Sequence, residues 1–143
     1  MADNACVFCR IAAGLSPAST IYSDGEILAF LDVRPVNPGH VLVIPRSHAV
    51  ELGDLHPQLG GRMFQVAQGV AAALRISGLR CDGVNLFLAD GKAAGQEVFH
   101  THLHVIPRFH GDKFRLVPNW PPPPGRDELD RIAAELRPAI APL

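Results

Sequence analysis

The sequence predicts an α+β domain with a mostly antiparallel five-stranded sheet, one long helix and short terminal helices. Two observations lead to this prediction: five short β-prone runs, most of them joined by turn residues, and one long run with helical periodicity. Strands joined by short turns pair antiparallel, because a parallel crossover needs a longer connection. At 143 residues the chain has the length of one domain and can bury about two-thirds of its unfolded surface.

Turn residues divide the N-terminal part of the chain into a short helix and a hairpin. Residues 6–13 are expected to form one or two helical turns, which Gly14 ends. The Asp24-Gly25 dipeptide readily supplies the positive φ angles of a tight hairpin turn. We therefore expect strands at residues 20–23 and 26–32 around it.

A third strand and the long helix follow. The run HVLVIPR, residues 40–46, is a strand that ends near Pro45, since proline cannot donate to a ladder. Beyond it, Pro57 suits the first turn of a helix and Gly78 its C-terminal cap. Spacings of three and four place one apolar stripe on this helix, facing a core. The stripe consists of Leu55, Leu59, Met63, Val66, Val70 and Leu74.

The remaining strands and the tail complete the organisation. Residues 83–91 (GVNLFLADG) predict the fourth strand and residues 99–108 (FHTHLHVIPR) the fifth. An extended proline run and a short amphipathic helix come after them. We expect one domain over residues 1–118, with residues 119–143 as an appendage to it.

Composition narrows the environment and the partners. Thirteen Lys and Arg residues against fourteen Asp and Glu leave no basic field that could hold a nucleic-acid polymer. The start lacks the segments of a signal peptide, and no apolar run is long enough to cross a bilayer. We expect a cytoplasmic protein without a membrane partner. The three cysteines then do not indicate a disulfide framework, and Cys81 reads as a partly buried small residue.

His100, His102 and His104 occupy every second position of the predicted fifth strand and so share one face. A surface accident, or three hydrogen-bonded half-buried rings, is a poor explanation for strict alternation. A tri-histidine zinc site is awkward, since three same-face positions span roughly 13 Å of strand. A third interpretation, in which one imidazole is a nucleophile for phosphoryl groups, explains a row of three histidines better than a zinc site does. A neutral ring attacks without charge repulsion, and its neighbours hold the phosphate oxygens.

Cys6 and Cys9 form a C-x-x-C pair with three possible meanings: a redox pair, two ligands of a zinc site, or two core residues. The redox meaning ranks last, because no strand precedes the pair. A closed zinc site needs two further ligands, and the sequence offers His48 and one member of the histidine row. The other histidines, His56 and His110, are expected at a helix cap and on the surface.

The stretch GQEVFHTHLHVIPR resembles the signature of the histidine triad (HIT) superfamily, His-φ-His-φ-His-φ-φ with φ apolar. FCRIAAGLSPASTIYSD, AFLDVRPVNPGHVLVIPRSH and GVNLF extend the resemblance over about residues 6–112. It implies a HIT-like fold and a nucleotidyl hydrolase or transferase. Such an enzyme acts at the α-phosphate of a nucleoside phosphate derivative, of the dinucleoside polyphosphate or phosphoramidate type. The alternative from another class is a zinc-stabilised nucleotide-binding module that regulates a partner without turnover.

The resemblance also implies roles for single residues. His102 matches the family's nucleophile, His104 the contact to the transferred phosphate, and His40 the histidine that closes the site from the neighbouring strand. Ala89 departs from the family, in which many members carry Asn or Gln there to touch the leaving group. The other implied contacts are Asp32 to the ribose, Gly95 and the catalytic Gln96 near the phosphates, Asn85 as a further substrate contact, and apolar walls at Phe8, Ile11, Leu28 and Phe30 for a purine or other base.

Two further expectations depend on the same resemblance. In branches that keep the C-x-x-C, it implies a structural zinc held by Cys6, Cys9, His48 and His100, with no open position for water. Family members also pair as homodimers through the long helix and the adjoining sheet edge. We therefore expect a zinc cofactor and a homodimer.

Overall fold

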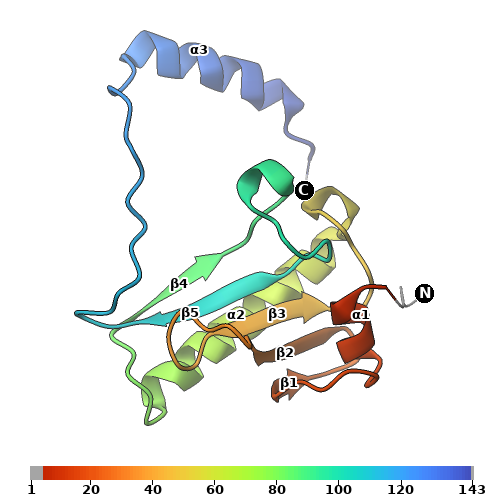
Figure 1. Cartoon of the computed structure of the whole chain (residues 1–143). Coiled ribbons are helices and arrows are strands. Elements are labelled where there is room, and N and C mark those ends of the chain that lie inside the picture. Colours follow the sequence, from red (N-terminus) through yellow and green to blue (C-terminus); the bar gives the residue numbers. More distant parts are fainter. Residues whose placement is uncertain (1–4, 143) are drawn as a thin grey trace. The chain divides into compact units, whose positions relative to one another are not determined.

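The computed structural model describes residues 5–142, and its part up to residue 113 holds a five-stranded sheet with helices on its faces (Figure 1). The strands lie in the order β1-β2-β3-β5-β4, and every neighbouring pair is antiparallel. This is the α+β architecture that the sequence predicts. The strands are β1 (Thr20–Ser23), β2 (Ile27–Leu31), β3 (Val41–Pro45), β4 (Gly83–Phe87) and β5 (Leu103–Arg108).

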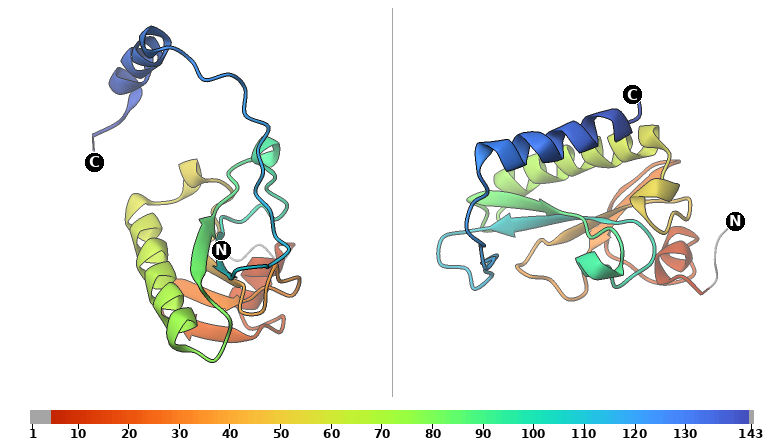
Figure 2. Two further views of the ribbon diagram at one scale, coloured as in Figure 1. Left: turned by 90° about the vertical axis from the view of Figure 1, so that its left-hand side faces the viewer. Right: turned by 90° about the horizontal axis from the view of Figure 1, so that it is seen from above.

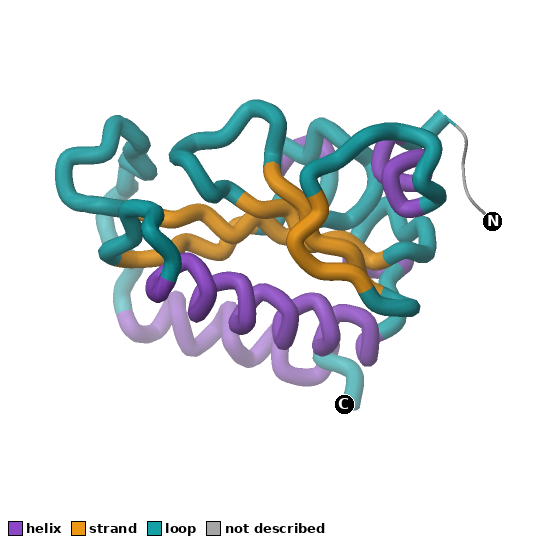
Figure 3. Tube along the Cα trace, turned by 90° about the horizontal axis from the view of Figure 1, so that it is seen from below, coloured by secondary structure: helices purple, strands orange, loops and turns teal. Residues whose placement is uncertain are grey.

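The long helix α2, Pro57–Ile76, runs along one face of the sheet (Figure 3). The predicted apolar stripe is confirmed as a buried face, with five of its six members buried and Leu59 packed against them, although Leu55 precedes the helix. His56 is the N-cap, as expected, because its Nδ1 accepts a hydrogen bond from the Gln58 N–H at 3.3 Å. The main core therefore lies between α2 and the sheet. Its sheet residues are Ile27, Ala29, Val41, Val43 and Val105.

The end of α2 corrects the prediction of a glycine cap. The helix ends at Ile76, and Ser77 is the C-cap residue in an extended conformation. The Ser77 hydroxyl donates to the Leu74 carbonyl at 2.9 Å. A side chain thus satisfies one of the last helical carbonyls, so a left-handed glycine at position 78 is not required.

The short helix α1, Val7–Ala12, packs on the opposite face of the sheet (Figure 2). Side chains alternate along β2 and β3, so the neighbours of the α2-facing residues point toward α1. Because both strands are buried on two sides, their sequences are continuous apolar runs. The second cluster consists of Phe8, Leu28, Phe30, Leu42 and Ile44.

The turn between β1 and β2 forms without the positive φ angle predicted for Gly25. Asp24 organises the turn instead: its Oδ1 accepts hydrogen bonds from the N–H groups of Glu26 and Ile27, at 2.8 and 2.7 Å. The carboxylate satisfies the donors of the turn. The turn therefore does not depend on a left-handed glycine.

The last two strands are shorter than predicted. β4 ends at Phe87, before the predicted limit at Gly91. After it, the Asp90 carboxylate accepts from the Leu52 N–H at 2.7 Å, at the start of the short 3-10 helix η1 (Leu52–Asp54). β5 begins at Leu103 instead of residue 99. The prediction that all three histidines lie in one strand is therefore wrong.

The β3–β5 ladder stops because of Pro45, which has no N–H to donate. Its carbonyl accepts from His100 Nε2 at 2.8 Å, and the Thr101 N–H donates to the Ala49 carbonyl at 2.7 Å. His100 thus lies in an irregular segment before β5, whereas His104 lies within β5.

The described chain divides into a unit that ends at Lys113 and a unit that begins at Phe114. The first unit holds the sheet, α1, α2 and both hydrophobic clusters. The second holds an extended proline-rich segment, α3 (Arg126–Leu136) and the 3-10 helix η3 (Arg137–Ala139), where the amphipathic helix was expected. No helix in residues 5–142 is long and apolar enough to cross a membrane.

Candidate active site and metal centre

A cavity of about 730 Å³ lies on the α1 side of the sheet. Its lining combines apolar side chains with three imidazoles, two carboxylates and one guanidinium, as a site for a partly apolar, partly charged ligand does. Most of the predicted catalytic and substrate-binding residues meet here. They are His40, His102, His104, Asp32, Gly95, Phe8 and Ile11; further apolar lining comes from Val7, Pro17, Ala18, Phe30, Leu42 and Val98.

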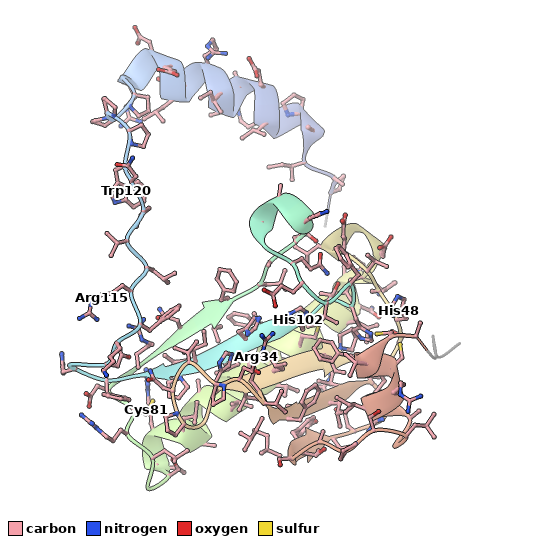
Figure 4. The ribbon with its side chains drawn as sticks, in the orientation of Figure 1. Arg34, His48, Cys81, His102, Arg115 and Trp120 are labelled. Carbon is pink, nitrogen blue, oxygen red and sulfur yellow. The ribbon has the colours of Figure 1, made fainter. Side chains whose placement is uncertain are left out.

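His102, which Figure 4 labels, has a ring orientation that one hydrogen bond fixes. Its Nδ1 lies 2.7 Å from the His100 carbonyl oxygen. A carbonyl only accepts, so Nδ1 carries the proton and Nε2 carries the lone pair. The ring of Phe8 packs edge-on against His102, with centroids 5.2 Å apart, and His102 is only 7% exposed. This hydrogen bond leaves Nε2 as the ring nitrogen of His102 that is free to carry a lone pair.

His40 and His104 form a second, oppositely oriented pair. The Val36 N–H donates to His40 Nδ1 at 3.1 Å, which places the proton of neutral His40 on Nε2. That Nε2 donates to His104 Nδ1 at 2.8 Å. His104 consequently carries its proton on Nε2. Where His102 offers a lone pair, His104 offers a hydrogen-bond donor.

Burial keeps this pair neutral. Desolvation is the largest cause that lowers the pKa of His104, to about 4, and the neighbouring His102 and His40 lower it further. Desolvation also lowers the pKa of His40, with Asp32 acting in the opposite direction. Neither ring therefore takes up a proton near neutral pH, and the donor–acceptor sequence is preserved.

Asp32 lies beside this pair, with its Oδ2 3.6 Å from His40 Nε2. Asp32, His40 and His104 are close enough together to hold a metal ion. Two observations favour a chain of hydrogen bonds over a metal site. His40 uses both ring nitrogens already, and its 2.8 Å separation from His104 is shorter than the N–N edge of about 3.3 Å in a zinc tetrahedron.

Cys6, Cys9, His48 and His100 bring their ligand atoms within 4.8 Å of one another. Of these residues, Figure 4 labels His48. Cys9 Sγ lies 3.2 Å from His48 Nδ1 and 3.5 Å from His100 Nδ1, and the two Nδ1 atoms are 3.3 Å apart. Cys6 Sγ lies 3.5 Å from His100 Nδ1. Zinc bond lengths require tetrahedral edges of about 3.3 Å for N–N and about 3.5 Å for S–N. The four predicted ligands therefore fit a zinc ion.

Local structure explains why the ligands converge. Cys6 is the N-cap of α1, and its Sγ accepts from the Cys9 N–H at 3.4 Å. The hydrogen bond from His100 Nε2 to the Pro45 carbonyl directs the other nitrogen, Nδ1, at the sulfurs. His100 is 0% exposed, and burial lowers its pKa. A buried neutral imidazole with one nitrogen anchored is what a metal-ligating histidine requires.

Gln96 is positioned differently from the prediction. Its Oε1 accepts from the Gly91 N–H at 2.8 Å, and its Nε2 donates to the Val50 and Val98 carbonyls at 2.7 and 3.1 Å. In this geometry the buried carboxamide organises the loop after β4. The adjacent Gly95, with a φ of 88°, does line the cavity.

Asn85 is likewise engaged elsewhere. Its Oδ1 accepts from Arg108 at 2.6 Å, and Arg108 in turn forms a paired contact with Asp112 at 2.6 and 2.8 Å. The guanidinium holds the pKa of Asp112 well below its usual range. Among the described residues that line the cavity, Asn85 does not occur. Its contacts join β4 to the end of β5.

Ala89 does line the cavity and is 5% exposed, while Asp90 is occupied with the Leu52 N–H. The position where many family members offer an amide thus presents only a methyl group.

The sequence analysis did not identify several cavity residues, among them Arg34, Glu97 and Phe87. Arg34 and Glu97 form an ion pair at 3.4 Å, with side chains 84% and 81% exposed (Figure 4 labels Arg34). Phe87 places its ring 5.8 Å from that of His104. Exposed charges in loops carry no periodic signal. Only the tertiary structure brings residues 63 positions apart in the sequence into contact.

The fold and the site together define an α+β domain in which a histidine-lined cavity adjoins a Cys₂His₂ cluster of zinc geometry. The HIT domain family model matches residues 13–111. The chain therefore belongs to the HIT family, as the resemblance of its motifs implies.

Three comparisons place the chain within this family. A crystal structure of a HIT family protein from Bacillus anthracis is 36% identical with a TM-score of 0.88, covering 99% of this chain and 100% of that chain. A zinc-bound histidine triad family protein from Mycobacterium smegmatis is 46% identical with a TM-score of 0.75, covering 94% of this chain and 97% of that chain. The adenylylsulfatase HINT3 of Arabidopsis thaliana is 38% identical over 110 residues, 77% of this chain and 55% of the relative.

Proposed function

We propose that the chain is a nucleotidyl hydrolase or transferase. Its substrate is a nucleoside phosphate derivative, either a dinucleoside polyphosphate or a nucleoside phosphoramidate. The enzyme cleaves this substrate at the α-phosphate through a nucleotidyl intermediate on His102. The observation that carries the proposal is the 2.7 Å hydrogen bond from His102 Nδ1 to the His100 carbonyl, which leaves the Nε2 lone pair for attack. The ring of His104 lies next to that of His102 and, with its proton on Nε2, can donate a hydrogen bond to a phosphate oxygen.

The reaction has two steps. His102 Nε2 attacks the α-phosphorus and forms a P–N bond, while the bond from phosphorus to the leaving group breaks and the leaving group takes its electron pair. Water then attacks the same phosphorus, the P–N electron pair returns to Nε2, and the released proton passes to solvent. If another acceptor replaces water, the outcome is transfer of the nucleotidyl group. His104 stabilises the charge on the oxygens in both steps.

The cavity supplies the rest of the binding site. We assign the apolar wall with Phe8, Ile11 and Phe30 to the base, adenine or another purine. We assign Asp32, which lies 3.6 Å from His40 in the cavity lining, to the ribose hydroxyls, from which a carboxylate can accept hydrogen bonds. The name of the Arabidopsis relative, an adenylylsulfatase, supports an adenylyl substrate.

We further propose that the cluster of Cys6, Cys9, His48 and His100 holds a structural zinc ion. Four protein ligands close a tetrahedral site, so zinc there supplies cross-linking rather than an activated water. The zinc-bound relative from Mycobacterium smegmatis supports this assignment.

The test is a substrate panel for the full chain: a dinucleoside polyphosphate, a nucleoside phosphoramidate and adenylylsulfate, each assayed by released AMP. We expect H102A to lose turnover by at least about a thousandfold. AMP affinity should stay within about fivefold, since the nucleophile acts chiefly in the transition state. H110A, which removes an exposed histidine outside the cavity, is the matched control.

Trapping the intermediate separates the candidate functions. Quenching in alkali during turnover, followed by mass spectrometry of peptides, should find an AMP adduct on His102. Turnover by H102A close to the wild-type rate would rule out the mechanism. AMP binding without turnover of any substrate and without an adduct would favour the non-catalytic nucleotide-binding module. Loss of activity at the instant of chelation, before any unfolding, would instead indicate a catalytic metal.

A further inference from the structure

Helix α1 contributes residues both to the group of four metal-ligand residues, called the metal cluster below (Cys6, Cys9, His48 and His100), and to the cavity. One side of this helix contributes the two cysteine ligands, one of them as its N-cap. Its other residues form part of the cavity wall, and Phe8 makes the most direct connection. The Phe8 ring lies 5.8 Å from the ring of His100, a metal ligand, and 5.2 Å from that of His102. The cavity-lining residues of α1 are Val7, Phe8 and Ile11.

His100 provides a second connection. Its ring offers Nδ1 to the cluster, and its backbone carbonyl accepts the hydrogen bond that sets the tautomer of His102. The ring is anchored at its other nitrogen by the Pro45 carbonyl, at 2.8 Å. A metal ion on Nδ1 would therefore hold this residue from both sides, and the position of its carbonyl would be held with it.

We propose that the Cys6, Cys9, His48 and His100 cluster positions the nucleophile and the cavity wall, so that metal binding fixes the His102 tautomer and strengthens nucleotide binding. The nucleotide part rests on the proposed function. The tautomer part rests only on the hydrogen bond between His102 and His100.

The physical reason is the crowding of four ligand atoms. The two sulfurs and two ring nitrogens all lie within 4.8 Å of one another, and four of their separations are 3.2 to 3.5 Å. A cation satisfies all four at once; without it, these contacts depend on weak hydrogen bonds from the thiols, and the groups can rearrange. That rearrangement releases the N-terminal end of α1 and the His100 ring. Because both also serve the cavity, metal and nucleotide affinities are coupled, and the coupling must be reciprocal.

The first experiment reads the tautomer directly. Long-range proton–nitrogen NMR spectra of the histidine rings are recorded on the ¹⁵N-labelled full chain at neutral pH, zinc-loaded and after chelation. We expect a single Nδ1–H tautomer for His102 in the loaded protein and a mixture of both tautomers after chelation. The same Nδ1–H tautomer in both samples would overturn the proposal.

The second experiment measures the reciprocal coupling. Zinc affinity is determined by competition with a chromophoric chelator, with and without saturating AMP. We expect AMP to tighten zinc binding by about 5- to 150-fold, the usual range of allosteric coupling. A ratio below about twofold, in a protein that binds AMP, would overturn the nucleotide part. Absence of AMP binding to the zinc-loaded protein would contradict the proposed function instead, and the His102 spectrum would still decide the tautomer part.

Matched variants separate metal binding from helix capping. C6S removes the thiolate ligand but keeps a good N-cap acceptor for α1. At zinc concentrations that saturate wild type, we expect it to bind AMP more weakly and to show mixed His102 tautomers. C81S, at a cysteine outside the cluster, should behave as wild type.

If C6S does not fold, F8L provides an independent test. It leaves all four ligands in place and removes the aromatic contact between the cluster and the cavity. We expect F8L to keep the zinc affinity of AMP-free wild type and to lose most of the tightening by AMP. Full tightening in F8L would show that Phe8 does not transmit the coupling and would overturn that connection.

Discussion

At the scale of single residues, His102 and His104 show how two imidazoles two positions apart acquire opposite roles. His102 Nδ1 donates to a backbone carbonyl, whereas His104 Nδ1 accepts from His40. The first ring is left with a lone pair on Nε2 and the second with a proton there. Residue type and alternation are the same for both. The difference arises from partners that lie outside the motif, such as the Val36 N–H on His40.

The lowered pKa of His104 predicts a pH-dependent contribution to stability. Its folded-state value of about 4 lies below its ordinary value of 6.5, so between these values the unfolded chain binds more protons. The contribution is complete above pH 6.5 and is lost as the pH falls toward 4. We expect H104Q to flatten the decline of the unfolding free energy across this window by up to about 1 kcal/mol per pH unit.

Urea unfolding of wild type and H104Q at several pH values in this window checks the prediction. Since the metal ligands titrate in both proteins, the difference between the two slopes isolates His104. H110Q, which alters an exposed histidine, should retain the wild-type slope. Parallel slopes for wild type and H104Q would contradict the assignment.

At the scale of elements, α1 owes its position to contacts at both of its ends. Six residues are too few for an independently stable helix. The metal cluster holds the N-terminal end. At the other end, Arg46 donates to the Ala12 carbonyl at 2.8 Å, and also to the Asp24 carbonyl and the Ser23 hydroxyl at 2.6 Å each. One guanidinium thus links β3, α1 and the β1–β2 hairpin.

We expect R46A to lower the unfolding free energy by about 2–3 kcal/mol, because a charged donor with three acceptors is lost. R46K should recover only part of this, since an ammonium group cannot reproduce the guanidinium geometry. Hydrogen exchange should become faster in residues 7–13, where the tether is lost. R75A, at an exposed arginine of α2, serves as the control. Equal stability of R46A and wild type would show that the tether is dispensable.

At the scale of the whole molecule, the two hydrophobic clusters and the metal cluster all lie within the unit that ends at Lys113. The metal cluster joins segments that are far apart in the sequence, from residue 6 to residue 100. A ligand that binds only the folded state stabilises it by mass action. The homodimer implied by the family resemblance stays a prediction.

Zinc removal should therefore destabilise the entire unit. With zinc at about a thousand times its dissociation constant, bound metal adds about 4 kcal/mol, which corresponds to a thermal midpoint higher by about 10 °C or more. Thermal unfolding with and without a chelator measures this difference. H48A, which lacks one ligand, should show a much smaller response to the chelator. An unchanged midpoint for zinc-loaded wild type after chelation would exclude a structural metal.

Removal of residues 114–143 should leave the first unit folded, because every buried residue of the two clusters lies between Phe8 and Val105. We expect a shortened chain, residues 1–113, to unfold cooperatively, with a thermal midpoint within about 5 °C of the full chain. Circular dichroism during heating measures this. A non-cooperative transition would show that the second unit takes part in the fold.

The sequence by itself determined the elements and the faces they bury. Strand alternation, the α2 stripe and turn residues act locally, so they can be read from neighbouring residues. The four metal ligands and His40, His102 and His104 were likewise predicted from motif and resemblance, and the structure brings each group together. Local patterns gave wrong predictions at two turns, where a left-handed glycine was expected. There the side chains of Asp24, at the hairpin, and Ser77, at the end of α2, make the hydrogen bonds instead.

The family resemblance implied how the histidine row is divided, but only the tertiary structure showed the physical cause of the division. Pro45 interrupts the ladder and draws His100 toward the cysteines, while His102 and His104 remain at the cavity. It also directed Gln96 and Asn85 to partners away from the cavity. These outcomes depend on atoms that lie tens of residues apart along the chain. Hydrogen-bond geometry between such atoms is set when the elements pack, and no local pattern encodes it.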